Sequence, residues 1–216
     1  METPYISIEG IKGSGKSLIF GQLCSLLKKE GIQPGILHTT QPIPDSTPLE
    51  WVATNFPYLR KFDGFNERLY AKRATWYAGQ LGQSHDLILG DRSIVTSYVT
   101  RWKKWGTPDT CIKRVDCLEA KVPAPHNVVW LYCEPQDALT RIQGRAARNY
   151  GLHDEKLERL IQAHNAYYEI FTQSQPPRLK NTEWVVVNGL RSPEIITREI
   201  FNWIQTEILT KKNKTI

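Results

Sequence analysis

The chain has 216 residues, of which 40% are hydrophobic and 23% are charged, and its formal net charge is +6 at pH 7. This length and composition are normal for a soluble globular protein with one full core, and no run approaches the roughly 18 apolar residues that a membrane span needs. The positive charge favours anionic ligands such as nucleotides, phosphates or nucleic acid, without choosing among them.

The chain begins METPYISIEG, which lacks the basic start, the apolar run and the small-residue cleavage site of a signal peptide. The cysteines form no CxxC pair and no metal-like spacing with histidine, so we expect four reduced thiols: Cys24, Cys111, Cys117 and Cys133. We therefore expect a cytoplasmic protein with no membrane partner.

Short apolar runs along the chain predict strands, and because they are continuously apolar we expect burial on both faces. They are Tyr5–Glu9, Pro34–Thr39, Asp86–Asp91, Val128–Cys133 and Glu183–Gly189. Helical patterns separate them, at Lys16–Gly31, Asn66–Gln83, Glu134–Ile142, Glu155–Ile170 and Ser192–Leu209. This alternation predicts an α/β fold of three layers, with a parallel sheet of about five strands and helices on both faces, in a single domain over 1–216.

Local signals refine these boundaries. Residues 40–48 hold several breakers and predict a loop. Ser192 is expected to cap the last helix, with Pro193 at its first position. The segment RWKKWG (101–106) interleaves aromatic and basic residues, and we expect it to continue a helix with tryptophans that pack, rather than to bind nucleic acid.

The segment from Gly10 to Ser17, GIKGSGKS, fits G-x-x-x-x-G-K-[ST] and follows a predicted strand. In such a P-loop the backbone N–H groups around the glycines surround phosphate oxygens at a helix N-terminus. The lysine reaches the β- and γ-phosphates and the hydroxyl binds Mg²⁺. We expect ATP and Mg²⁺ as cofactors, bound by Gly10, Gly13, Ser14, Gly15, Lys16 and Ser17.

The segment GDRS ends the third predicted strand with Asp91 and Arg92. Ligands of open α/β sheets bind beyond the carboxyl ends of strands, where an acid can join a metal shell and an arginine can bind phosphate. A local ion pair is the alternative for such a pair in isolation. Beside a P-loop on the same sheet edge we expect a functional role, with Asp91 and Ser17 near the metal.

Three arginines, Arg141, Arg145 and Arg148, are spaced so that a helix would carry them on one face. One interpretation is a solvated basic face. The other is a helical lid around residues 140–152 that closes over the donor phosphates and excludes water.

Five segments, in matching order and spacing, resemble the thymidylate kinase family of P-loop nucleoside monophosphate kinases. They are ISIEGIKGSGKS, TTQPIPDSTPLE, LYAKRA, LILGDRSIVTSY and LYCEPQDALTRIQGR. The later four resemble the family's T-R-E-P-G-G-T-P-L-G, F-A-A-D-R-A, D-R-Y-x-x-S-S and D-P-E-x-A-L-x-R-I motifs, the first of these with two extra residues here. The resemblance covers most of the chain and implies transfer of the γ-phosphoryl group of ATP to dTMP.

The same resemblance implies roles for individual residues. The donor phosphates would be held by Lys16, with Arg141, Arg145 and Arg148 in or beside the lid. Catalysis would rest on positioning and charge neutralisation by Lys16, Asp91, Arg92 and Arg145. Arg73 would bind the acceptor's 5′-phosphate, and the whole acceptor side would comprise Lys12, Gln41, Leu69, Arg73, Arg92 and Ser93.

The chain departs from the family pattern on the acceptor side. Lys12 replaces the P-loop acid, and Thr40-Gln41 replaces an Arg-Glu pair. Leu69 replaces the phenylalanine that stacks on thymine, and Ser93 replaces a tyrosine. Because the donor-side residues are intact, the pattern supports ATP binding more strongly than it supports dTMP as the acceptor.

Three hypotheses follow. The first is a kinase for nucleoside monophosphates, most directly dTMP. The second is a kinase of the same fold with another acceptor, because DRSIVTSY also resembles the E-R-S motif of deoxynucleoside kinases. Gln41 argues against a nucleoside acceptor, since a hydroxyl needs a base that glutamine cannot supply. The third is an ATP-binding regulatory protein without turnover.

We expect a small-molecule nucleotide as the partner of this site and no nucleic acid. The resemblance also implies a homodimer formed through helices, without indicating where its interface lies.

Overall fold

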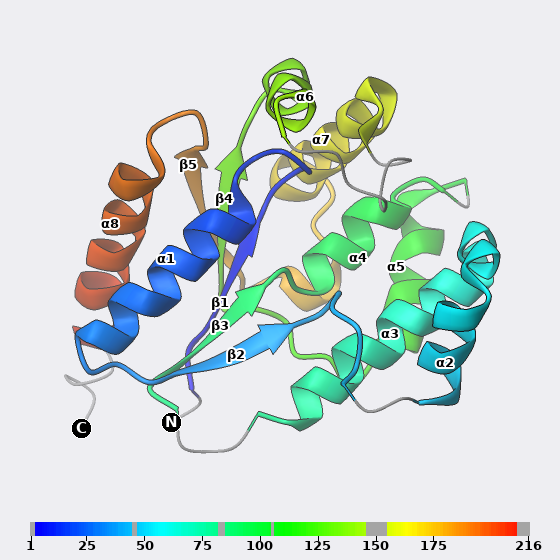
Figure 1. Ribbon diagram of the computed structural model, residues 1–216, viewed down its shortest axis with the longest axis horizontal. Coiled ribbons are helices and arrows are strands. Elements are labelled where there is room, and N and C mark those ends of the chain that lie inside the picture. The colour runs from blue at the N-terminus through cyan, green and yellow to red at the C-terminus, as the bar shows by residue number, and fades with distance from the viewer. Residues whose placement is uncertain (1–2, 45–46, 82–84, 105, 146–154, 211–216) are drawn as a thin grey trace.

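The structure is a computed structural model that describes residues 3–44, 47–81, 85–104, 106–145 and 155–210. It is an α/β protein built on a five-stranded sheet (Figure 1). The strands are β1 (Tyr5–Glu9), β2 (Pro34–His38), β3 (Leu87–Asp91), β4 (Asn127–Tyr132) and β5 (Glu183–Asn188). All five predicted strands are therefore present, with bounds that differ by at most one residue at either end.

The sheet is parallel throughout, and its strand order is β2-β3-β1-β4-β5. β1 lies at the centre, with Ile8 in register with Asp91 on one side and with Val129 on the other. His38 of β2 is in register with Asp91 as well. The carboxyl ends of β2, β3 and β1 therefore lie next to one another at a single edge of the sheet.

The helices are α1 (Lys16–Lys29), α2 (Pro48–Asn55), α3 (Asp63–Gly79), α4 (Ile94–Arg101), α5 (Pro108–Leu118), α6 (Pro135–Gln143), α7 (Leu157–Thr172) and α8 (Pro193–Trp203). Short 3₁₀ turns cover Pro57–Lys61 and Pro177–Leu179. Four of the helices begin with proline after a Ser, Thr or Glu residue, the pattern that favours a helix start.

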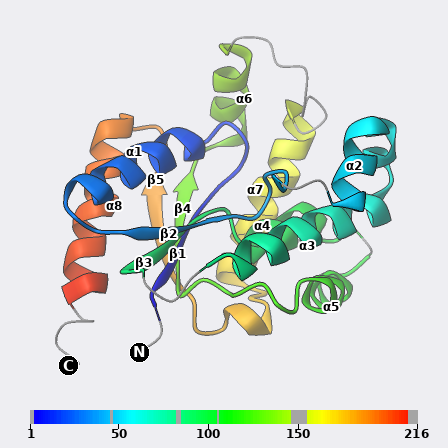
Figure 2. The same ribbon diagram turned by 60° about the horizontal axis from the view of Figure 1, so that its bottom comes forward.

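Helices cover both faces of the sheet, as the two views show (Figures 1 and 2). On one face, α1 and α8 pack on the strands through a fully buried cluster that includes Leu23, Leu27 and Ile200. On the other face, α4, α5 and α7 form a second cluster around Tyr98 and Tyr167. This arrangement confirms the predicted three-layer architecture with a parallel sheet of five strands.

β5 departs from the expected burial on both faces, since Val186 is 47% exposed. The reason is topological: β5 is an edge strand that pairs only with β4. The prediction that a helix continues through residues 101–106 is also wrong, because α4 ends at Arg101. Trp102 there leaves the helical conformation, and its indole Nε1 donates to Glu169 Oε2 at 2.9 Å.

The last predicted helix is present, but it changes from an α-helix to a π-helix along its length. Ser192 caps α8 by accepting a hydrogen bond from Ile195 N, and Pro193 is the first residue, as predicted. After Trp203 the chain continues as a π-helix over Ile204–Leu209. Among the described residues, no helix is long and apolar enough to cross a membrane.

Candidate functional site

The P-loop connects β1 to α1 and depends on glycine for its course. Gly10, Gly13 and Gly15 have φ values of 143°, 92° and 96°, which L-residues with side chains rarely adopt. A Cβ atom at Gly13 would lie 2.5 Å from the carbonyl oxygen of Ala138 in α6. The loop backbone therefore packs directly against the start of α6, and α1 begins immediately after Gly15 with no acidic residue in its first turn.

Lys16 is only 5% exposed, and its amine lies within the loop. Its Nζ donates to the Ile11 carbonyl oxygen at 2.7 Å and lies 3.4 Å from Ser14 Oγ. Burial and the nearby Arg92 hold the pKa of Lys16 well below its ordinary value. A phosphate in the loop would supply the negative charge that favours the protonated amine. Ser17 is exposed at the first turn of α1, open to a ligand.

Asp91 and Arg92 end β3 beside the P-loop, as the strand register requires. Burial would raise the pKa of Asp91, but contact with His38 and the cations Arg92 and Lys16 outweigh it and lower the pKa below its ordinary value. His38 Nδ1 lies 3.8 Å from Asp91 Oδ2. Arg92 has a φ of 72°, which is uncommon for a residue with a side chain and is often found at functional sites.

A buried carboxylate, that of Glu9, contacts the residues that follow Asp91 and Arg92. Glu9, the last residue of β1, is 0% exposed and accepts hydrogen bonds from three hydroxyls: Ser93 Oγ at 2.7 Å, Thr96 Oγ1 at 2.7 Å and Tyr167 OH at 2.8 Å. Burial raises the pKa of Glu9, although the three hydroxyls and Arg92 each favour its ionised form. Ser93, expected on the acceptor side, is thus 0% exposed and caps α4 by accepting from Val95 N.

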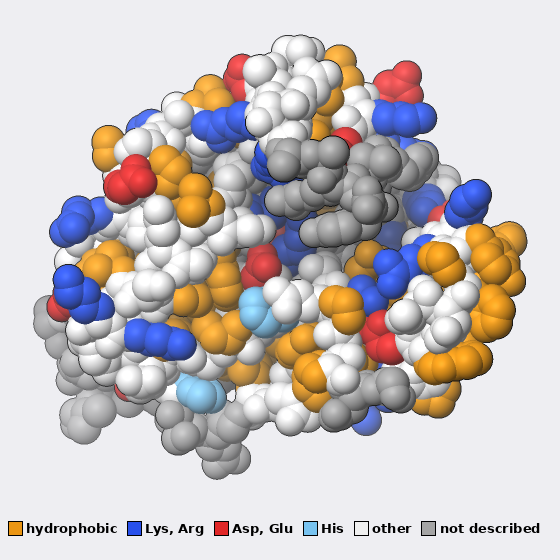
Figure 3. All heavy atoms as spheres, viewed as in Figure 1, with side chains coloured by type: hydrophobic (Ala, Val, Ile, Leu, Met, Phe, Trp, Pro, Cys, Tyr) orange, Lys and Arg blue, Asp and Glu red, His pale blue; other side chains and the backbone are white. Residues whose placement is uncertain are grey.

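A cavity of about 300 Å³ opens beside the P-loop, between α6 and the start of α8. It is lined by Gly13, Ser14 and Gly15 together with three arginines, Arg141, Arg145 and Arg191. Arg141 Nη1 donates to the Gly189 carbonyl oxygen at 2.7 Å, which fixes the arginine to the loop after β5. In the space-filling view, Lys and Arg side chains gather in the hollow at the middle of the face (Figure 3).

The expectation that Arg141, Arg145 and Arg148 share one helical face is wrong for Arg145. α6 ends at Gln143, and Gly144, a poor helix former, stands at its C-cap. Arg145 follows in a turn, with its N–H donating to the Ile142 carbonyl oxygen. Arg148 and most of the proposed lid lie outside the described residues, so residues 140–152 are seen only as far as Arg145.

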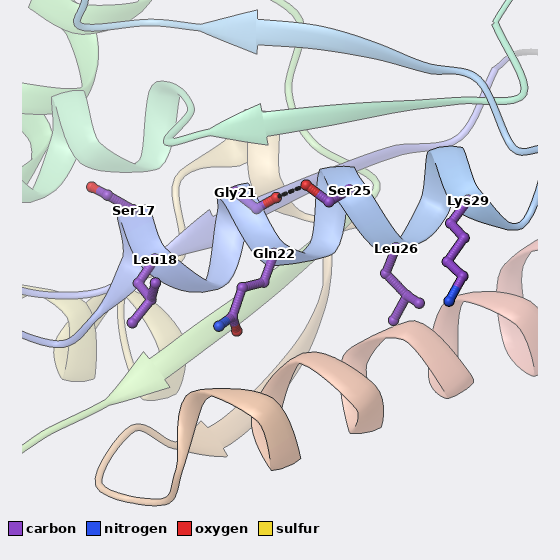
Figure 4. Close-up of a pocket in the computed structure, with 7 residues that line it drawn as sticks. All are labelled: Ser17, Leu18, Gly21, Gln22, Ser25, Leu26 and Lys29. Atoms are coloured by element: carbon purple, nitrogen blue, oxygen red, sulfur yellow. Dashed lines mark hydrogen bonds between the residues drawn. The ribbon is translucent and has the colours of Figure 1, made fainter.

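A larger and more open groove of about 530 Å³ runs along the outer face of α1 beside α8 (Figure 4). It begins at Ser17 and Leu18 and ends at Lys29, whose side chain carries the one charge among its lining residues. The groove is predominantly apolar and therefore does not have the cationic character of a phosphate site.

Arg73, which we expected to bind an acceptor phosphate, is already paired within the protein. Arg73 of α3 is 3% exposed and binds both carboxylate oxygens of Glu50, from Nε at 2.5 Å and from Nη2 at 2.8 Å. Its Nη1 donates to the Thr40 carbonyl oxygen at 2.9 Å. Arg73 of α3 therefore joins Thr40, just after β2, to Glu50 of α2, with three of its N–H groups in use.

The other residues that we expected on the acceptor side differ in their exposure and contacts. Gln41 is exposed in the loop, whereas Leu69 is 1% exposed inside α3. Lys12 forms an ion pair with Glu155, with Nζ 3.0 Å from Oε1. This P-loop side chain therefore faces an acid from the segment before α7.

Sequence reasoning missed four buried residues that pack around this site: Glu9, Thr96, Tyr167 and Glu50. A signal existed for the first two, because the strand YISIE ends in an acid and Thr96 follows Ser93 by three residues, on the same face of α4. Nothing in the local pattern around Tyr167 or Glu50 indicates their partners, which are brought near only by the fold.

No known family model matches the chain. Two curated proteins are similar to it over most of its length. A thymidylate kinase of Colwellia psychrerythraea is 26% identical over 176 residues, covering 78% of this chain and 82% of that protein. A probable thymidylate kinase of Thermoplasma volcanium is 24% identical over 216 residues, covering 94% of this chain and 98% of that protein. These relatives support a phosphotransferase that acts on nucleotides.

Proposed function

We propose that this protein is a nucleotide kinase that transfers the γ-phosphoryl group of ATP to a nucleoside monophosphate, with dTMP as the foremost acceptor. The observation that carries the proposal is the meeting of the P-loop with Asp91 and Arg92 at one edge of the sheet, where Ile8 and Asp91 are in register. Ligands of open parallel sheets bind at such an edge. The two thymidylate kinase relatives support the choice of a nucleotide acceptor.

The donor half of the reaction follows from the loop. Backbone N–H groups of Gly13 to Ser17 would surround the phosphates at the N-terminus of α1, and Lys16 would turn from the Ile11 carbonyl oxygen to the phosphate oxygens. The cavity lined by Arg141, Arg145 and Pro193 adjoins the loop and has the size and mixed lining to accept the rest of the nucleotide.

The oxygen ligands at this site suit Mg²⁺ better than they suit a metal held by the protein alone. Among the described residues, no group of three or more His, Cys, Asp or Glu side chains forms a metal cluster. Mg²⁺ commonly takes one or two protein oxygens and completes its shell with water and substrate phosphates. Ser17 Oγ and the ionised Asp91 would supply those oxygens, and the ion would neutralise charge on the transferring phosphoryl group.

The protein's own contribution to phosphoryl transfer is position and charge. Lys16, Arg92 and Arg145 are close enough to influence one another electrostatically, since Arg92 and Arg145 both depress the pKa of Lys16. Cations gathered in this way favour a negatively charged phosphoryl group over an uncharged ligand. A phosphate acceptor is ionised at neutral pH and needs no base, which agrees with the absence of a carboxylate at Gln41.

One observation favours the second hypothesis, a different acceptor. Arg73 would have to bind an acceptor phosphate with the N–H groups that Glu50 and the Thr40 carbonyl leave free, or exchange Glu50 for the phosphate. A kinase of the same fold whose acceptor carries no phosphate at that place would leave the Arg73–Glu50 pair intact.

A panel of acceptors with ADP release as the signal tests these alternatives. With Mg²⁺ and ATP, we expect dTMP to stimulate ADP release above the rates with other nucleoside monophosphates, nucleosides and small phosphorylated compounds. Lys16→Ala should remove the stimulation, whereas Lys28→Ala, an exposed lysine of the same helix, should not. Tight ATP binding with no acceptor-dependent release would instead support the regulatory protein without turnover.

A further inference from the structure

The hydroxyl of Thr96 lies between a buried carboxylate and the arginine of the candidate site. Thr96 Oγ1 donates its one hydrogen to Glu9 Oε2 at 2.7 Å. Arg92 Nη1 in turn donates to Thr96 Oγ1 at 3.4 Å. Because a hydroxyl has a single hydrogen, donation to Glu9 turns the oxygen's lone pairs towards Arg92. The chain of donors therefore runs in one direction, from Arg92 to Thr96 to Glu9.

The other contacts of Glu9 hold this arrangement without touching Arg92's side chain. Ser93 Oγ donates to Glu9 Oε1, which fixes the first turn of α4 to the end of β1. Tyr167 OH donates to Glu9 Oε2 from α7 at 2.8 Å, and it also lies 3.5 Å from Thr96 Oγ1. Glu9 is 0% exposed, and Thr96 and Tyr167 are 6% and 1% exposed, so water does not compete for these bonds.

The backbone conformation of Arg92 also requires support from its neighbours. Arg92 has a φ of 72°, a strained conformation for a residue with a side chain, which persists only where its surroundings enforce it. Its N–H donates to the Ile8 carbonyl oxygen at 3.3 Å, next to Glu9. Both ends of Arg92 are thus held by the last two residues of β1, the carboxylate acting on the side chain through Thr96.

We propose that Glu9 is a positioning residue: it orients the Thr96 hydroxyl as an acceptor for Arg92 and so holds the guanidinium in place for phosphoryl transfer. The catalytic consequence rests on the kinase activity proposed above. Misplacement of such a group by about 1 Å costs rate rather than ground-state binding, because the guanidinium is needed most where charge develops on the transferring group.

Thr96 and Tyr167 form a matched pair for the test, since each donates one hydrogen bond to the same oxygen of Glu9. Thr96→Val and Tyr167→Phe each remove one hydroxyl while keeping the shape. We expect comparable losses of stability in urea unfolding. We expect Thr96→Val alone to lower kcat, by about tenfold, with KM for ATP changed by less than about twofold. Thr96→Ser, which restores the hydroxyl, should recover most of the wild-type kcat.

The pathway through Arg92 is tested by a double-mutant cycle. In an Arg92→Ala background, Thr96→Val should lower kcat no further, because its effect is transmitted by the guanidinium. A tenfold loss that persists in that background would overturn the proposal. So would equal losses of kcat in Thr96→Val and Tyr167→Phe, since both would then act by loosening the core.

A spectroscopic measurement separates this inference from the activity itself. The Arg92 Nε–H signal in ¹⁵N-labelled protein, assigned by its loss in Arg92→Lys, should shift in Thr96→Val and stay in place in Tyr167→Phe. If no acceptor supports turnover in the wild type, the proposed kinase function fails. The Arg92 signal then still decides the positioning role, which an unchanged signal in Thr96→Val would overturn.

Discussion

Lys12 Nζ lies 3.0 Å from Glu155 Oε1, so that the middle of the P-loop is joined to the segment just before α7. The two side chains are 24% and 16% exposed, and the pair is therefore only partly screened by water. Lys12 stands where the resemblance to thymidylate kinases led us to expect an acid. The charge of Lys12 is therefore paired within the protein. Any effect of Lys12 on a substrate would involve Glu155 as well.

The Lys12–Glu155 pair predicts that charge reversal at Lys12 can be rescued. Lys12→Asp places two acids together, so we expect both lower stability and lower turnover in the ADP-release assay. Adding Glu155→Lys restores an ion pair of the opposite polarity and should recover most of both losses. Recovery of stability without recovery of turnover would mean that Lys12 acts on the acceptor directly.

The P-loop predicts opposite outcomes for two glycine substitutions. Gly13→Ala places a Cβ 2.5 Å from the Ala138 carbonyl oxygen at a φ of 92°, so we expect loss of ATP binding and lower stability. Gly21 lies in α1 with nothing within 4 Å of the Cβ position, in the open groove of Figure 4. Gly21→Ala should stabilise the protein by about 0.5–1 kcal/mol through helix propensity. Thermal melting and ATP titration measure both variants.

We predict that substitution of Asp91 lowers turnover much more than it lowers ATP affinity. Asp91→Asn removes the negative charge at the end of β3 while keeping its shape, so we expect kcat to fall by about 100-fold and ATP affinity to change far less. Asp86→Asn is the matched control, because Asp86 stands just before the same strand and accepts from Gln33 N at the opposite edge of the sheet. Equal losses of kcat and of affinity in Asp91→Asn would contradict the role given to Asp91.

The Arg73–Glu50 pair predicts how stability depends on pH. Burial would raise the pKa of Glu50, but the hydrogen bonds from Arg73 and from Ile43 N outweigh it and hold the pKa below its ordinary value. The pair therefore stabilises the folded state above the unfolded-state pKa, and this contribution is lost as the pH falls through the folded-state pKa.

Glu50→Gln tests this pH dependence. At neutral pH it should cost about 3–5 kcal/mol, because it leaves Arg73 buried without its counter-ion. As the pH falls through the lowered folded-state pKa of Glu50, the wild type becomes protonated there and its stability should approach that of the variant. Urea unfolding at several pH values measures the gap, and a gap that stays constant with pH would contradict the ion pair as its cause.

Much of the fold could be predicted because its signals are local. Each strand is a short apolar run, and each is found within one residue of its predicted bounds at either end. The P-loop is likewise encoded in eight adjacent residues, since the glycine conformations and the following helix depend on near neighbours. α5 was not predicted, although Thr107 and Pro108 mark its start.

The sequence by itself determined the parallel α/β architecture and a loop suited to phosphates, because hydrophobic periodicity and glycine placement act over a few residues. Only the tertiary structure decided which buried polar groups meet. Glu9 and Tyr167 are 158 residues apart, and Arg73 and Glu50 are 23 apart, yet each pair is buried and joined by hydrogen bonds. Such partners are chosen by the packing of whole helices on the sheet, and burial then makes their pairing obligatory, since an unpaired charge in the core costs too much free energy.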